Sequence, residues 1–421
     1  MLHVVFVIPF ATANTQRFAR AVAALPDVRL SVVSQDPPQR FPAQFREQLA
    51  GFEQVGDAMV VDDLCAGIER LAKKLGPVSR LLGVLEPLQE PLAQARERLR
   101  IRGMDHGAAQ NFRDKARMKD LFGAHAIPCA RHRLCGSVDE ALAFARQVGF
   151  PLVGKPPAGA GAKATQRCND ERELQQFLAQ IRPTRGREVL LEEFVVGREF
   201  SFDSVTLHGR NVLHNICCYY PTPLEVVENP WIQWCIVLPR ELDDPAFAEI
   251  HRTGPRALAA LGMWTGISHM EWFRRRDGSI AISEVAARPP GAQIVPLIGQ
   301  VLDCDMFDAL ARLWVFEEFP ERPRRYAAAC AFLRGQLPGS RVDAAADKVA
   351  RAKSRIVALH GVEAMQQKVG KLIVDLKLPA VGAAPVDSYE GDGHVIVRHP
   401  DTAVVTQAVQ EIVRTVRVEL G

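Results

Sequence analysis

The chain has 421 residues, of which 48% are hydrophobic and 24% charged, with a formal net charge of +3. This length exceeds a single compact core, so several structural units are expected in an ordinary globular composition. Lys and Arg nearly balance Asp and Glu, which gives no case for nucleic-acid binding. The nine cysteines form no CxxC pair and no zinc-like spacing, which is typical of a reducing cytoplasm.

The N-terminal part of the chain alternates between strand and helix patterns. Residues 4–8 and 28–33 are rich in β-branched side chains and predict strands, with a helix at residues 15–25 between them. The first apolar run is far shorter than the roughly 20 residues of a membrane helix, so no membrane segment is expected there. Strand, helix, strand order predicts a doubly wound αβ domain, which we place at residues 1–107. No GxGxxG follows the first strand, so a dinucleotide site lacks its main support.

The middle of the chain, residues 108–320, mixes helix and strand patterns. Residues 112–122 predict one amphipathic helix, and Ser137 with Glu140 forms a capping box for another. Residues 221–244 are expected to be irregular because they are rich in proline. Strands are expected at residues 189–195, 200–207, 212–218, 267–273 and 280–285. A smaller αβ unit is expected at residues 321–421.

The strongest chemical signal is a hairpin with two glutamates. Asp277-Gly278 is a favoured two-residue turn, which pairs residue 276 with 279 and sets Glu271 directly across from Glu284. Opposed side chains have Cβ atoms roughly 4.5–5.5 Å apart, so two carboxylates there repel each other unless a cation lies between them. The residues expected on this face by strand alternation are His269, Glu271, Phe273, Ile282 and Glu284.

A hard divalent cation would resolve that repulsion, since Mg²⁺ takes one or two carboxylates together with substrate phosphates. Arg288 follows where the second strand ends and could stabilise negative charge on a phosphoryl or acyl-phosphate oxygen. The alternative is a solvated hairpin with two surface glutamates. The apolar neighbours Phe273 and Ile282 argue against full exposure, because Glu and Arg are rarely buried without partners.

Three further segments are candidates for contacting a nucleotide. Lys155 ends a short apolar strand and precedes a Gly/Ala-rich run whose backbone could approach phosphates, although such runs also form plain loops. Lys115 belongs to a basic helix whose charged face could equally be solvated. Residues 190–200 are a strand and turn that could offer backbone groups to adenine, with Glu199 near a ribose, or could be an ordinary strand–turn–strand.

Taken in order, these segments resemble the ATP-grasp superfamily over roughly residues 108–318. The matching segments are Asp114-Lys115, Gly149-Phe-Pro-Leu-Val-Gly-Lys155 with the glycine-rich run after it, Glu192-Glu-Phe-Val-Val-Gly-Arg-Glu199, Glu271, and Glu284-Val-Ala-Ala-Arg288. The resemblance implies an α/β protein with the ATP-grasp fold: a doubly wound N-terminal domain, a lid at about residues 125–195, a central antiparallel sheet and a small C-terminal αβ unit.

The resemblance also implies a role for each matching position, with ATP and Mg²⁺, or Mn²⁺ in its place, as cofactors. Arg288 would be catalytic, and Glu271 and Glu284 would bind the metal. The residues implied to contact ATP are Lys115 and Lys155 at the phosphates, Gly159, Ala160 and Gly161 in the loop over them, Glu192, Phe194 and Val195 at the adenine, and Glu199 at the ribose. His269, Arg288 and Gly291 would contact the substrate, although His269 could be structural or could orient Glu271.

The implied activity is that of a cytoplasmic ligase that joins a small-molecule carboxylate to an amine through an acyl phosphate, most similar to dipeptide-forming L-amino-acid ligases. A homodimer is an expected assembly, and neither nucleic acid nor membrane is an expected partner. Many family members carry Asn two residues after the second glutamate, where this chain has Ala286. This departure leaves an inactive nucleotide sensor as one alternative. A separate alternative is a carboxylate or small-molecule kinase that stops after phosphorylating its substrate.

The sequence does not name the substrate. Aromatic residues between His214 and Trp234 could wall a pocket for an apolar or aromatic acid, or could be ordinary packing. They are Tyr219, Tyr220, Trp231 and Trp234.

Overall fold

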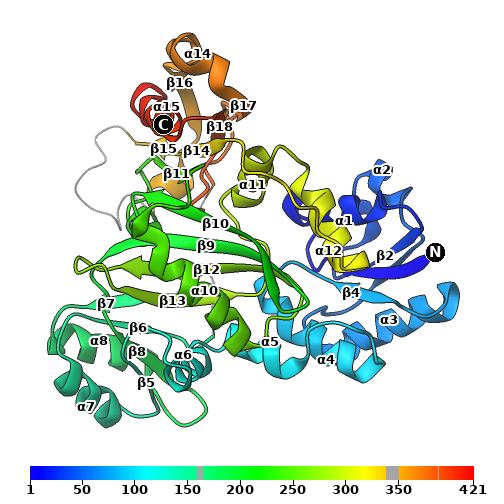
Figure 1. Ribbon diagram of the computed structural model, residues 1–421, viewed down its shortest axis with the longest axis horizontal. Helices are drawn as coiled ribbons and strands as arrows, with labels where there is room; N and C mark the ends of the chain where they lie inside the picture. The colour runs from blue at the N-terminus through cyan, green and yellow to red at the C-terminus, as the bar shows by residue number, and fades with distance from the viewer. Residues whose placement is uncertain (159–164, 338–349, 387) are drawn as a thin grey trace.

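The structure, a computed structural model, describes residues 1–158, 165–337, 350–386 and 388–421 (Figure 1). In this part of the chain an N-terminal αβ unit and a small four-stranded lid flank a long eight-stranded sheet, and the C-terminal helices lie at the far end of that sheet. Among the described helices, none is long and apolar enough to cross a membrane.

The N-terminal unit is a parallel four-stranded sheet with helices on both faces, as the sequence predicts. The strands, in the order β3-β2-β1-β4, are β1 (Leu2–Val7), β2 (Val28–Ser34), β3 (Gly51–Gln54) and β4 (Arg80–Leu82). The helices are α1 (Ala13–Ala23), α2 (Ala43–Arg46), α3 (Val61–Leu75) and α4 (Gln89–Leu99). Phe18 of α1 packs on one face, and Leu64 of α3 with Leu92 of α4 packs on the other. Burial on both faces explains the nearly continuous apolar runs of the strands.

The central sheet is antiparallel throughout and continues into the C-terminal part of the chain. Its strands, in spatial order, are β13 (Ile280–Ala286), β12 (Gly266–Arg274), β9 (Arg198–Leu207), β10 (Arg210–Tyr220), β11 (Trp234–Leu238), β14 (Ala327–Leu333), β18 (Gly393–His399) and β17 (Ile373–Lys377). Since β14 pairs with β11, the domain boundary expected at residue 320 falls within a continuous sheet. The boundaries at residues 107 and 320 stay predictions.

The lid is an antiparallel sheet covered on one face by two helices. Its strands, in the order β5-β8-β6-β7, are β5 (His132–Cys135), β8 (Val189–Glu193), β6 (Leu152–Lys155) and β7 (Gln166–Cys168), and its helices are α7 (Val138–Val148) and α8 (Glu171–Ile181). Ser137 caps α7 as predicted, because its hydroxyl accepts from the Glu140 N–H at 3.2 Å. The reciprocal bond of the expected capping box is shifted by one residue, since the Glu140 carboxylate accepts from Gly136 N–H at 2.7 Å.

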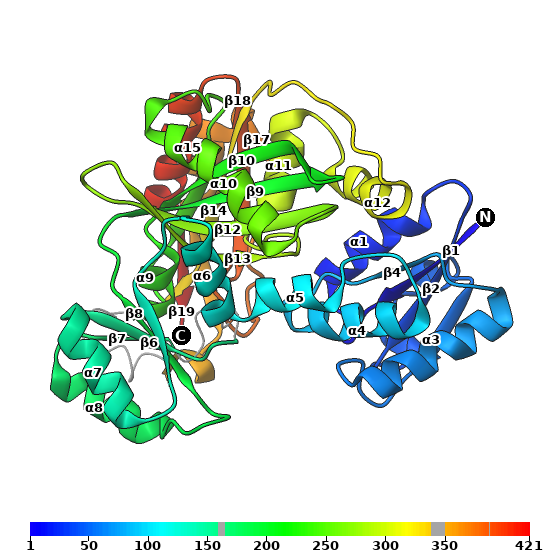
Figure 2. The same ribbon diagram turned by 60° about the horizontal axis from the view of Figure 1, so that its bottom comes forward.

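The remaining helices cover the central sheet and its C-terminal end. They are α5 (His106–Arg113), α6 (Lys115–Ala124), α9 (Pro223–Glu228), α10 (Ala248–Leu261), α11 (Ile294–Leu302), α12 (Met306–Phe316), α14 (Val362–Val369) and α15 (Thr402–Thr415). A three-stranded sheet consists of β15 (Gly335–Gln336), β19 (Arg417–Leu420) and β16 (Ile356–His360). Short 3₁₀ helices lie at Pro38–Arg40, Glu86–Leu88, Pro245–Phe247 and Gly370–Leu372. Figure 2 shows α5 between α4 of the N-terminal unit and α6 beside the lid.

Two sequence predictions about this region are wrong. The single helix expected at residues 112–122 is broken at Asp114, which has φ −90° and ψ 108° and whose carboxylate caps α6 at the N–H groups of Ala116 and Arg117. The proline-rich stretch expected to be irregular contains α9 and the fully buried strand β11. Pairing with β10 and β14 supplies the backbone hydrogen bonds of β11, so its neighbours impose the strand.

Candidate active site

A cavity of about 380 Å³ lies between the lid, the central sheet and the N-terminal unit. Each expected site residue that the structure describes lines it: Lys115, Lys155, Glu192, Phe194, Val195, Glu199, His269, Glu271, Glu284, Arg288 and Gly291. The sequence positions of these residues span more than 170 places, so the fold brings them together. Gly159, Ala160 and Gly161 lie outside the described residues.

The two glutamates of the hairpin are directly paired, as predicted, but the turn between them differs from the prediction. Arg275 N–H donates to Ser279 O at 2.8 Å, so the loop has three residues and ends at Gly278 with φ +86°. This longer loop shifts the pairing by one residue, to Trp272 with Ile282. A β-bulge at Ser283 then restores the register, so that Glu271 pairs with Glu284.

The bulge also changes which side chains share the face of the glutamates. Phe273 pairs with Ala281, so Ala281 shares that face, and the prediction that Ile282 would do so is wrong. Ile282 pairs with Trp272, and both belong to the core beneath the hairpin. The Trp272 ring stacks on Phe200 with centroids 4.8 Å apart, an arrangement that adds roughly 0.5–1.5 kcal/mol to simple burial. The packed side chains of Trp272, Ile282 and Phe200 therefore support the strands that carry the two glutamates.

Glu271 is held by a chain of polar side chains on the same face of the sheet. His269 Nδ1 lies 2.6 Å from Asp203 Oδ1 and His269 Nε2 lies 3.6 Å from Glu271 Oε1, while the Ser201 hydroxyl donates to Asp203 Oδ2 at 2.7 Å. Burial alone would lower the pKa of His269, but Asp203 and Glu271 raise it to about 9. Burial would raise the pKa of Glu271, but His269 holds it below its usual value.

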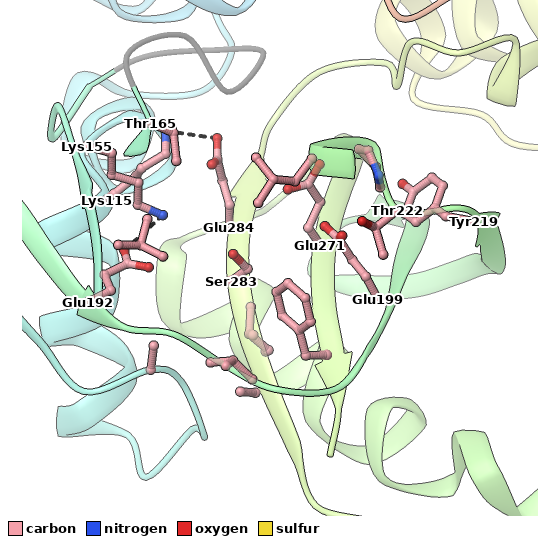
Figure 3. A pocket seen from close by; sticks show the side chains of 18 of the residues that line it. Lys115, Lys155, Thr165, Glu192, Glu199, Tyr219, Thr222, Glu271, Ser283 and Glu284 are labelled. Atoms are coloured by element: carbon pink, nitrogen blue, oxygen red, sulfur yellow. Dashed lines mark ion pairs between the residues drawn. The ribbon is translucent and has the colours of Figure 1, made fainter. Parts of the chain in front are cut away.

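Glu284 faces a lysine from the other side of the cavity. Lys115 Nζ lies 3.0 Å from Glu284 Oε1, and Figure 3 shows this ion pair reaching from α6 to β13. The break at Asp114 makes Lys115 the first residue of α6, and its N–H donates to Pro157 O at 2.9 Å. The helix break thus ties Lys115 to the segment that follows Lys155.

A second lysine of α6, Lys119, does not line the cavity but contacts two residues that do, and the sequence analysis did not single it out. It is fully buried, and its Nζ donates to Ser283 O at 2.9 Å, the carbonyl of the bulged residue. Glu192 Oε1 lies 3.5 Å from Lys119 Nζ and 2.9 Å from Lys155 Nζ. The pKa of Glu192, which burial would raise, is lowered by the two lysines. The sequence did contain a signal for Lys119, because it lies four residues after Lys115 and therefore on the same face of the helix.

The segment expected to meet the nucleotide base lies at the lid side of the cavity. Phe194 and Val195 follow β8 and line the cavity, and Arg167 lies over the Phe194 ring at 4.2 Å. Glu199 is the second residue of β9 and pairs with Phe273 across the sheet. Burial, reinforced by the charge of Glu271, raises the pKa of Glu199 from its ordinary value of 4.5 to about 8.

Arg288 is anchored by a residue of the N-terminal unit. Its Nε and Nη2 donate to Glu86 Oε2 at 3.1 and 2.9 Å, and Arg113 Nη1 donates to Glu86 Oε1 at 2.6 Å. Glu86 is buried and lines the cavity. Burial would lower the pKa of Arg288, but Glu86 raises it. No pattern in the sequence indicates Glu86, because it lies about two hundred positions from Arg288.

The turn after Arg288 is held by the C-terminal part of the chain. Glu390 accepts from Ala292 N–H at 2.9 Å and from Gln293 Nε2 at 3.0 Å, and both residues have positive φ. A Cβ at Gly291 would lie 2.6 Å from Tyr389 Oη, so glycine is required for this close approach. Tyr389, which the sequence analysis also missed, lines the cavity together with Tyr219 and Trp234. Tyr220 and Trp231 are not among the lining residues.

The donor set of the hairpin fits the Mg²⁺ that the resemblance implies. Glu271 and Glu284 supply two opposed carboxylates, of which Glu284 pairs with Lys115 and Glu271 shares the His269 ring with Asp203. Within the described residues there is no group of three or more His, Cys, Asp or Glu that could hold a metal. Protein side chains would therefore hold a hard cation only together with ligand oxygens such as phosphates, which is the usual arrangement for Mg²⁺.

Comparison with known proteins agrees with this geometry. The family model of the ATP-grasp domain matches residues 120–302. Among curated proteins, the chain is 22% identical to protein y4rH of Sinorhizobium fredii (strain NBRC 101917 / NGR234) over 86% of this chain and 72% of that protein. It is 24% identical to an alanine–anticapsin ligase of Bacillus subtilis over 65% of this chain and 66% of that protein, so it spans about two thirds of the latter's length.

The fold extends over the whole chain in one solved structure. The crystal structure of an L-amino acid ligase from Bacillus licheniformis superposes with a TM-score of 0.76 at 15% identity, covering 99% of this chain and 98% of that chain. The expected combination of doubly wound unit, lid and antiparallel sheet is thereby confirmed. This protein has the ATP-grasp fold, and residues 120–302 are its ATP-grasp domain.

Proposed function

We propose that this protein is an ATP-dependent carboxylate–amine ligase that forms an amide bond through an acyl phosphate and releases ADP and phosphate. One observation carries the proposal: Glu271 and Glu284 are opposed in a cavity whose other walls supply Lys115, Lys155 and Arg288. The similarity to an alanine–anticapsin ligase and the fold of an L-amino acid ligase support the reaction class.

The residues divide into groups that serve successive steps. Lys115 and Lys155 would bind the phosphates of ATP, Phe194 and Val195 would pack against the base, and Glu199 would accept from the ribose. Glu271 and Glu284 would hold Mg²⁺, which when bound neutralises the polyphosphate. Positioning and charge neutralisation of this kind supply most of the catalysis of phosphoryl transfer.

The proposed reaction has two transfers. An oxygen of the substrate carboxylate attacks the γ-phosphorus, and the bond to the β-phosphate oxygen breaks to release ADP. The amine nitrogen then attacks the acyl carbon, loses a proton, and inorganic phosphate leaves. Arg288, fixed by Glu86, would stabilise the negative oxygens of both steps, and the lid would exclude water that would hydrolyse the acyl phosphate.

The substrate end of the cavity combines Arg288 with an apolar wall. Tyr219, Trp234 and Tyr389 line this end, and Trp234 Nε1 donates to the backbone O of Tyr389 at 2.7 Å, which fixes the indole ring. We propose free amino acids as the carboxylate and amine substrates, one of them with an apolar side chain.

One observation favours the alternative of a nucleotide sensor. Ala286, where many family members carry Asn, is buried and pairs with His269, whose ring is engaged by Asp203. An alanine side chain cannot coordinate a metal, so position 286 supplies no ligand for a second ion. For the ligase we therefore propose a single Mg²⁺. No comparable observation favours the kinase.

The test is incubation of the purified protein with Mg-ATP and a panel of amino-acid pairs, one of each pair carrying ¹⁸O in its carboxylate. The ligase requires ADP and dipeptide formation that depend on both amino acids, with one ¹⁸O transferred to the released phosphate. ADP release without an amine and with a stable phosphorylated acid would support the kinase. Nucleotide binding without ADP release across the whole panel would support the sensor.

A further inference from the structure

A second cavity, of about 290 Å³, lies behind the loop that carries Arg288. Its walls come from β4 and α4 of the N-terminal unit, from the turn between α10 and β12, and from the end of α12. Figure 2 shows these elements where the N-terminal unit meets the central sheet. This volume is near the lower end of the range for small-molecule sites. Nothing in the proposed ligase reaction requires this cavity.

Arg96 of α4 is the distinctive side chain of this cavity. Its Nε and Nη2 donate to Leu81 O at 3.1 and 2.7 Å, which fixes one edge of the guanidinium. A Cβ at Gly103 would lie 2.6 Å from Arg96 Cδ, so this glycine makes room for the side chain. Within the described residues, Arg96 has no ion pair with a carboxylate, and its Nη1 has no hydrogen bond. Burial lowers its pKa to about 10.

The other arginines in the described lining all have carboxylate partners. Arg80 and Arg102 both pair with Glu317, at 3.4 and 2.9 Å, and Arg288 pairs with Glu86. Of the two lining acids, Glu317 is thus already shared, and Asp105 caps α5 by accepting from Ala108 N–H at 2.7 Å. Arg96 is left as a partly buried cation whose counter-charge the described protein residues do not supply, and such a group favours an anionic partner.

The rest of the wall is apolar and partly aromatic. Trp264 is 60% exposed at the rim, and Trp314, Met263 and Ile267 line the interior. An exposed tryptophan beside a partly buried arginine suits a ligand that has one charged end and one flat apolar end.

We propose that this second cavity binds a small organic oxyanion, a carboxylate or phosphate ester with an aromatic or apolar body, whose charged end contacts Arg96 and whose body packs on Trp264. Because Ala287, Arg288 and Pro289 also line the cavity, the ligand lies against the loop that holds Arg288.

The test is calorimetric titration of the full chain, in EDTA and without nucleotide, with phenyl phosphate and with benzoate, which separate the two oxyanion classes. The wild type should bind at least one probe at millimolar concentration. Arg96→Gln should lower the affinity for that probe about tenfold, because a charge-assisted contact is lost. Arg98→Gln is the matched control, since Arg98 is on the same helix but exposed and paired with Asp62. Binding to Lys155→Met should be unchanged, which separates this cavity from the candidate active site.

Trp264→Ala is a second variant that should fold, because the side chain is mostly exposed. It should weaken binding of the preferred aromatic probe and leave the circular dichroism spectrum unchanged. Equal affinity of the wild type and Arg96→Gln for the probes would overturn the proposal, as would failure of the wild type to bind either probe. If Arg96→Gln does not fold, unchanged affinity in Trp264→Ala would overturn it instead. Loss of binding in Lys155→Met alone would assign the anion to the active site.

Discussion

The two ends of the active-site cavity differ in charge. At the lid end, Lys119 and Lys155 both pair with Glu192, and Lys115 begins the helix that carries Lys119. The second carboxylate at this end, Glu193, pairs with Arg131 and Arg275. At the sheet end, the acids Glu199, Asp203, Glu271 and Glu284 face one cation of the sheet, His269. The ion pair of Lys115 with Glu284 connects the two ends, as Figure 3 shows.

This difference indicates what each end can bind. The lid end has more positive than negative charge and suits phosphates, whereas the sheet end has too few cations and suits a metal. The raised pKa of Glu199 is the physical sign of that deficit, because a buried carboxyl beside another anion retains its proton. A complex of a triphosphate with a divalent cation would satisfy both ends together.

The largest expected effect comes from removing a carboxylate at the sheet end. Glu284→Gln should lower ADP release about 10³-fold, because it removes charge at the position where the metal and the phosphates would meet. The measurement is steady-state ADP production over a range of Mg²⁺ concentrations. Glu363→Gln, on an exposed position of α14, is the control and should retain activity. Full activity of Glu284→Gln would refute the proposal that the sheet end of the cavity binds the metal.

The two lysines of α6 should behave differently from each other. Lys119→Met should lower the free energy of unfolding by about 3 kcal/mol, because it disrupts a buried ion pair and leaves Ser283 O without its donor. Lys115→Met should instead weaken ATP binding about tenfold, because its charge faces the cavity. Urea unfolding and ATP titration of both variants provide the measurements. The reverse pattern would contradict the division between a structural and a ligand-binding lysine.

Removing the charge of Asp203 should lower turnover less, because Asp203 acts on Glu271 only through His269. Asp203→Asn keeps the shape but loses the charge that holds the imidazole, so turnover should fall about tenfold, as for other residues that orient a metal ligand. The apparent Mg²⁺ affinity should fall with it, which a purely structural role would leave unchanged. Asp243→Asn, an exposed acid, is the control. Unaltered Mg²⁺ dependence in Asp203→Asn would show that the chain from Asp203 to Glu271 has no positioning role.

The smallest effect is on the pH dependence of stability. The unfolded chain ionises Glu199 near 4.5, whereas the folded protein keeps the proton until about pH 8. The folded state therefore binds more protons across this window, so this residue makes stability fall as pH rises from about 4.5 to about 8. The measurement is urea unfolding in EDTA at pH values near both ends of this window. The free energy of unfolding should fall less with rising pH for Glu199→Gln than for the wild type. Parallel slopes would mean that Glu199 ionises normally.

Sequence reasoning predicted local and periodic features well. The parallel strands of the N-terminal unit, the Ser137 cap and the pairing of Glu271 with Glu284 follow from residue patterns that act over a few positions. The sequence also contained a signal for the buried polar side chains that hold Glu271. In β9, polar and aromatic residues alternate: Glu199, Ser201 and Asp203 are separated by Phe200 and Phe202.

The hairpin shows where such reasoning reaches its limit. The predicted pairing is confirmed although the turn is one residue longer, because the bulge at Ser283 compensates for it. Lys119 donates to the carbonyl of that bulged residue, so a contact between α6 and β13 stabilises a local geometry that strand alternation cannot predict.

The sequence by itself determined most of the element pattern and supplied the residue types for which we propose Mg-ATP binding. Only the tertiary structure decided the partners: Glu86 for Arg288, Lys119 for Glu192 and Ser283, and Tyr389 beside Gly291. These contacts join positions that are about 70 to 200 residues apart in the chain. Such pairs form because burial removes water from each charge or backbone carbonyl and leaves another part of the fold to supply its partner.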